Sequence, residues 1–116
     1  WCNEDAPLIW GNILREMTVL PPTVPLAGEF DLLETIMKPE GMARFKSYLA
    51  AHPQITGIQQ QRVIAAFLDK FAIEDALEEE LDMPDWTDEL VEQMTEIYDA
   101  DVAQIQQIPG IRMLLP

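Results

Sequence analysis

The chain has 116 residues, of which 48% are hydrophobic, and its 21 acidic and seven basic residues leave a net charge of −14 at pH 7. This length fits a single domain, and the apolar content is that of a globular protein rather than a disordered one. The acidity argues against nucleic acid and anionic membrane surfaces as partners, because both are bound through clustered Lys and Arg side chains.

The single cysteine, Cys2, has no second cysteine with which to form an intramolecular disulfide, and we expect a reducing, cytoplasmic location. No apolar run approaches the length of a transmembrane helix. Trp1 stands where an initiator Met is usual. We therefore expect residues 1–116 to form a single helical domain that is either complete or a piece of a longer protein.

Apolar residues recur at three- and four-residue steps through the first seventy residues, which predicts amphipathic helices. Asp5 and Thr56 are the expected N-caps of the first and the fourth helix. Pro and Gly residues fall in the short connectors between them. The second expected helix begins at Ala27, the first three end near Val19, Met37 and Ala51, and the fourth carries one apolar stripe as far as Phe71.

The apolar stripe changes phase after Phe71. Ile73 and Leu77 lie on a different side of a helix from the apolar residues that precede them. We predict one helix that continues past this point with a local irregularity and ends at Pro84. A break near Ala72 that separates two helices is the alternative.

A last helix is expected to begin at a cap formed by Asp85 or Thr87 and to run to about Gln106. No segment alternates with a period of two, so we predict an all-α fold, a compact bundle of five to six short-to-medium helices with short Pro/Gly connectors. The expected core stripe of the last helix comprises Leu90, Val91, Met94, Ile97, Tyr98, Val102 and Ile105.

The segment from Phe71 to Gly110 holds thirteen acidic residues and no Lys or Arg. Several acids of the last helix follow three- and four-residue spacing, and such like-charged neighbours repel by a few tenths of a kcal/mol each. Three explanations of this acidic surface are open: a solvated face that maintains solubility, a docking surface for a basic protein, and neutralisation of the acids by basic residues of the third and fourth helices. The candidate partner-binding residues are Glu78, Glu79, Asp82, Asp85, Trp86, Glu89, Glu92, Glu96 and Asp99.

Motifs that carry chemistry are missing from the sequence, which has no Gly-x-Gly-x-x-Gly, Walker A, Gly-x-Ser-x-Gly or Cys-x-x-Cys pattern. The acids at 78–85 lack the spacing of an EF-hand loop, and the one histidine, His52, cannot supply the paired Glu-x-x-His motifs of a di-iron bundle. We predict no catalytic, cofactor-binding or metal-binding residues and no cofactor.

The leading functional hypothesis is a small acidic helical protein–protein interaction module, of the adaptor, inhibitor or immunity type. It docks a partner with a basic surface through its acidic C-terminal helices; its oligomeric state stays open. One alternative is a helical bundle that binds an apolar small ligand among Trp10, Phe30, Phe67 and Tyr98.

A second alternative is that the chain is the helical portion of a larger enzyme whose catalytic part lies outside it. The last helix, followed by Ile108-Pro109-Gly110-Ile111, resembles C-terminal segments of bacterial sulfotransferase-like proteins over the final quarter of the chain. The phosphate-binding loop that such enzymes need is absent from this sequence. The resemblance therefore transfers no fold, activity or site residue to this chain.

Overall fold

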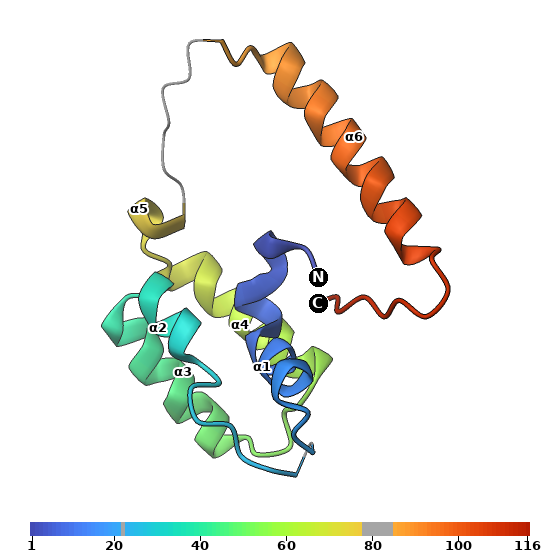
Figure 1. The fold of residues 1–116 in the computed structure, drawn as a ribbon. Helices are drawn as coiled ribbons and strands as arrows, with labels where there is room; N and C mark the ends of the chain where they lie inside the picture. The colour runs from blue at the N-terminus through green and yellow to red at the C-terminus, as the bar shows by residue number, and fades with distance from the viewer. Residues whose placement is uncertain (22, 78–84) are drawn as a thin grey trace. The chain divides into compact units, whose positions relative to one another are not determined.

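The computed structural model describes residues 1–21, 23–77 and 85–116 (Figure 1). Within these ranges the chain forms six α-helices and one short 3-10 helix, and its only extended pairing is an isolated bridge. The prediction of an all-α fold is confirmed. The chain divides into two compact units, residues 1–79 with 114–116 (unit 1) and residues 80–113 (unit 2). The expected single domain stays a prediction.

Unit 1 begins with the 3-10 helix η1 (Asn3–Asp5) and continues with five α-helices. Helix α3 packs on α4, α1 contacts α2 and α4, and α2 contacts α3 and α5. The described part of unit 2 contains α6 (Asp88–Gln106). The helices of unit 1 are α1 (Ala6–Thr18), α2 (Asp31–Ile36), α3 (Pro39–Ala51), α4 (Ile58–Phe71) and α5 (Glu74–Leu77).

Phe45 of α3 lies at the centre of the main core of unit 1 and is completely buried. The rings of Phe30 and Phe67 meet it edge-on, with centroid distances of 5.2 and 5.5 Å, a geometry that aromatic pairs prefer. The apolar stripes expected for the first four helices thus face one another in this unit. The other buried members of the cluster are Leu33, Ile36, Met37, Met42, Ile64 and Phe71.

A second buried cluster lies on one face of α1. Ala6, Ile9 and Ile13 recur at three- and four-residue steps and are buried. Leu114, which belongs to the C-terminal tail, packs against them. The tail is therefore part of unit 1 at its last three residues.

Gly41 permits the close approach of α3 to the end of α4. A Cβ atom added at Gly41 would lie 2.4 Å from the Cβ of Phe71 and 2.6 Å from its Cγ. Both distances are far below van der Waals contact, and Phe71 is held in the core. A side chain at position 41 would therefore push the two helices apart.

Two expected helix starts differ from the structure. Helix α2 begins at Asp31 rather than near residue 27, because residues 27–30 form a turn in which the Asp31 amide donates to the Gly28 carbonyl at 3.1 Å. The prediction of Thr56 as the N-cap of α4 is wrong. The cap is Gly57, whose φ of 56° lies in the left-handed region that glycine adopts readily.

The predicted continuation of α4 through Ala72 is also wrong, and the alternative of a break there is what the structure shows. Ala72 is extended, with φ −61° and ψ 151°, and forms an antiparallel bridge with Met37. The Lys38 amide donates to the Phe71 carbonyl at 2.8 Å, and the Ile73 amide donates to the Ile36 carbonyl at 2.9 Å. Because the α2–α3 connector satisfies these backbone groups, helical bonds are not needed there. The expected end at Pro84 lies outside the described residues.

Candidate functional site

The candidate site is α6, a helix of 19 residues with strong local start signals. The Thr87 hydroxyl accepts a hydrogen bond from the Leu90 amide at 3.2 Å, so Thr87 is the N-cap. Asp88 and Glu89 occupy the first turn, where negative charge interacts favourably with the helix dipole. The helix ends at Gln106, as the sequence predicts.

One side of α6 is apolar and half-exposed. Six of its side chains have exposed fractions from 36% at Leu90 to 51% at Ile97, Val102 is less exposed, and no residue of α6 is buried. Within residues 85–113 α6 is the only helix described, so no second helix of its own unit covers this stripe. The expectation that the stripe packs as core stays a prediction. We call this surface the apolar face; it comprises Leu90, Val91, Met94, Ile97, Tyr98, Val102 and Ile105.

The opposite side of α6 is acidic. At about 100° per residue, its acids lie across the helix from the apolar face. All of them are exposed, and α6 contains no Lys or Arg. We call this surface the acidic stripe; it comprises Glu89, Glu92, Glu96 and Asp99.

Three of the four basic residues of α3 and α4, which the sequence offers as a means of neutralising the acidic stripe, have partners inside unit 1. Lys46 forms an ion pair with Glu34 of α2. The cationic groups of Arg44 and Lys70 lie 5.5 and 5.6 Å from the ring centroid of Phe71, within the range of a cation–π interaction. These contacts weaken the hypothesis that the basic side chains of α3 and α4 neutralise the acidic stripe of α6.

Asp101 differs from the other acids of α6 because it lies within the apolar face. It follows Ile97 by four residues and Tyr98 by three, and it precedes Ile105 by four, so these side chains are its neighbours on the helix surface. Its side chain is exposed. The sequence-based site prediction omitted Asp101, although the spacing that defines the apolar stripe also places this residue on it.

The other predicted partner-binding residues are placed as follows. Asp85 and Trp86 precede the N-cap of α6, and Trp86 is 52% exposed. The structure gathers Glu89, Glu92, Glu96 and Asp99 on one helix face. Glu78, Glu79 and Asp82 lie outside the described residues.

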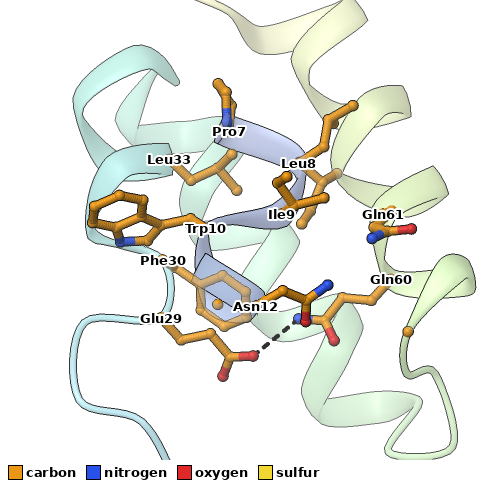
Figure 2. Close-up of a pocket in the computed structure, with 13 residues that line it drawn as sticks. Pro7, Leu8, Ile9, Trp10, Asn12, Glu29, Phe30, Leu33, Gln60 and Gln61 are labelled. Carbon is orange, nitrogen blue, oxygen red and sulfur yellow. Dashed lines mark hydrogen bonds between the residues drawn. The ribbon is translucent and has the colours of Figure 1, made fainter. Parts of the chain in front are cut away.

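A small pocket in unit 1 lies between α1, the turn before α2 and the start of α4 (Figure 2). Its volume is about 50 Å³, and Trp10 and Phe30 line it. Figure 2 shows Glu29 and Gln60 joined across it, with the Gln60 amide donating to the Glu29 carboxylate at 3.5 Å. Drug-sized ligands occupy pockets of about 300–1,000 Å³. This pocket has room for about one or two water molecules.

Phe67, which the ligand hypothesis also names, packs on Phe45 and does not line this pocket. A more open hollow of about 420 Å³ lies along α2 and α3. Met37 and Met42 form its apolar floor, and the Lys46–Glu34 ion pair lies beside them. An apolar ligand would find more room in this hollow than in the small pocket.

Within residues 1–21, 23–77 and 85–116, no three His, Cys, Asp or Glu side chains cluster closely enough to hold a metal ion. Among the helices of that same part of the chain, none has both the length and the apolar character needed to cross a membrane.

Comparison of the chain with protein-family models, with curated proteins and with solved structures found no match. The function is therefore inferred from the residues of this chain, above all from those of α6.

Proposed function

We propose that this protein is a helical interaction module that binds a basic partner protein through α6. The observation that carries the proposal is the pairing of a half-exposed apolar face with an acidic stripe on one helix that has no basic residue. A helix that served solubility alone would need the acids but not the apolar face. Burial of that face gains about 25 cal/mol for each Å² removed from water.

The two faces have different roles in this proposal. The apolar face makes the contact, as an amphipathic helix does when it lies in a hydrophobic groove. The acidic stripe points away from that groove and attracts a positively charged partner from a distance, which raises the association rate. Asp85 and the exposed Trp86, which precede the N-cap, add one further acid and one aromatic side chain at the N-terminal end of α6.

The charge of α6 favours a basic protein over two other occupants. Helices that lie on membranes carry Lys and Arg on their polar face, whereas that face of α6 is acidic. A second copy of α6 would bring a second set of like charges and no basic residue to oppose it. An adaptor, an inhibitor or an immunity-type protein fits these requirements.

The proposal is tested by the binding kinetics of the full chain with a synthetic amphipathic helix of about 20 residues, built from Leu and Lys. The variant Glu89→Lys/Glu92→Lys/Glu96→Lys should lower the association rate by about tenfold at low salt and flatten its salt dependence. Ile97→Ala should instead raise the dissociation rate, because it removes contact area.

A matched control places the same charge change on unit 1. Glu40, Asp69 and Glu74 are exposed acids there, and their triple replacement by Lys alters net charge equally. The control should lower the association rate much less than the α6 variant does. Equal effects of the two variants, or no binding of the Leu/Lys helix by the wild-type chain, would contradict the proposal.

A second candidate function is the binding of an apolar small ligand, which the hollow lined by Met37 and Met42 favours. Ala43 lines this hollow and is exposed, so Ala43→Trp fills the hollow without disturbing the core. If the hollow is a ligand site, the chain binds a fluorescent apolar probe and this variant loses that binding. Binding that Ala43→Trp leaves unchanged would remove the hollow as the site. No feature of the described residues favours the enzyme alternative over these two.

A further inference from the structure

Asp101 places one carboxylate in the middle of the apolar face of α6. Ile97 and Tyr98 lie one turn before it and Ile105 one turn after it, and the exposed fractions of these three side chains are 51%, 44% and 42%. A partner that covers these apolar side chains must also cover Asp101, because all four share one surface. Docking therefore removes the carboxylate from water.

A carboxylate that loses its water requires a compensating cation. An isolated buried charge is so unfavourable that buried carboxylates in proteins are paired or neutralised. We infer that the partner presents an apolar helix face interrupted by one Arg or Lys, which pairs with Asp101 when α6 docks. The inference rests on the proposed function and specifies the chemistry of the partner surface that contacts α6.

The pair of Asp101 with the partner's cation determines which partner surface binds, and it adds little buried apolar area. A partner with an unbroken apolar face would leave Asp101 buried without a cation, and an acidic residue there would repel it. Arg suits the position better than Lys because its planar guanidinium can make two hydrogen bonds to one carboxylate.

Two other occupants of the apolar face do not supply this cation. A second copy of α6 brings another Asp101, and the segment from Phe71 to Gly110 contains no Lys or Arg. The acyl region of a lipid bilayer offers no cation, and its anionic headgroups repel the acids of the helix.

The experiment uses the full chain and three synthetic Leu/Lys helices that differ at one position of their apolar stripe, which holds Leu, Arg or Glu. That position is moved along the stripe so that every register is sampled. At the best register, the Arg peptide should bind about tenfold tighter than the Leu peptide, and the Glu peptide should bind weakest. Asp101→Asn should abolish the preference for Arg.

The matched control is Asp99→Asn, which removes the same charge two residues away but on the acidic stripe. It should keep the preference for Arg and lower the affinity for the three peptides slightly, because it removes one charge from the acidic stripe. The preference should also persist between about 50 and 300 mM salt, because a pair removed from water is screened little. Circular dichroism of both variants shows whether α6 remains helical.

Three results would overturn the inference. The first is an Arg peptide that binds no tighter than the Leu peptide in every register. The second is loss of the preference in Asp99→Asn as complete as in Asp101→Asn. The third is binding of the chain to anionic vesicles, or self-association through α6, in place of peptide binding. Binding of the peptides without an Arg preference overturns this inference alone. Failure of all three peptides to bind overturns the proposed function as well.

Discussion

Helices α4 and α6 carry the same kind of apolar periodicity and differ in what covers it. In α4, Ile64 and Phe71 are buried and Phe67 packs against Phe45 of α3. In α6, Met94 and Ile97 are 49% and 51% exposed. Apolar spacing therefore predicts a helix and the side it offers for contact. Whether that side is covered depends on a second surface, which spacing alone does not identify.

Residues of α3 form the surface that covers the apolar side of α4. Gly41 lets the two helices approach, and Phe45 fills the space between α2, α3 and α4. Within residues 85–113 no second helix is described that would do the same for α6. Because of this difference, we interpret the apolar stripe of α4 as core and propose the apolar face of α6 as a docking surface.

The largest expected effect contrasts one core residue with one residue of the apolar face. Phe45→Ala removes a completely buried ring and should lower the free energy of unfolding by about 3–5 kcal/mol. Ile97→Ala should lower it by less than about 1 kcal/mol, because that side chain is half-exposed and packs on no other helix of its unit. Urea denaturation followed by circular dichroism measures both. Similar losses for the two variants would mean that α6 is part of the core.

The next effect tests the close approach of α3 and α4. Gly41→Ala should lower the free energy of unfolding by about 1–3 kcal/mol, because the new Cβ overlaps Phe71. Gly11 of α1 is the matched control, since its added Cβ would lie 3.1 Å from the movable Glu29 side chain. Gly11→Ala should be close to neutral, as better helix propensity offsets the shift. An equal loss at both glycines would contradict this interpretation.

A third effect concerns the local signals on which α6 relies. Thr87→Ala removes the hydroxyl that accepts the Leu90 amide bond and should destabilise the helix by about 1 kcal/mol. Because no other helix of its unit supports α6, this loss should appear as reduced helicity at residues 88–92 in NMR chemical shifts. Thr95→Ala, inside the same helix, is the control and should leave helicity unchanged or raise it. Unchanged helicity after Thr87→Ala would show that packing, and not the cap, maintains α6.

The smallest effect tests backbone strain in unit 1. Val19 ends α1 with φ 56° and ψ 30°, a left-handed conformation that is unfavourable for a β-branched residue. Val19→Gly should stabilise the chain by about 0.5 kcal/mol after the entropy of glycine in the unfolded state is counted. Val24→Gly, in the same connector and without a positive φ, should destabilise it slightly. Thermal unfolding scans compare the two, and destabilisation by Val19→Gly would show that the strain is negligible.

Much of unit 1 is predictable from local signals. Pro7 and Pro39 lie in the first turns of α1 and α3, and α3 ends at Ala51, where the sequence places its end. The break at Ala72 is not decided by the sequence, because it depends on hydrogen bonds from Lys38 and Ile73 to groups distant along the chain. Such pairing is visible only after folding.

In the candidate site, too, the local features are predictable from the sequence and the packing is not. The sequence places the acidic stripe on one helix face and limits the cap of α6 to Asp85 or Thr87, of which the structure shows Thr87. Both features depend on residues within one or two helical turns. It assigns the apolar stripe to the core because most amphipathic helices are covered. Charge alone groups Asp101 with the other acids, and only its spacing from Ile97 and Ile105 places it on the apolar face.

The central claim, that α6 is a docking helix, is tested most directly by amide hydrogen exchange of the full chain with and without the Leu/Lys helix that carries one Arg. We predict that the peptide slows exchange at residues 88–106 by at least about tenfold, because docking supplies the packing that α6 lacks within its unit. The amides of α1, α3 and α4 should be unaffected. Unchanged exchange in α6 when the peptide is bound, or slowing confined to unit 1, would contradict the account.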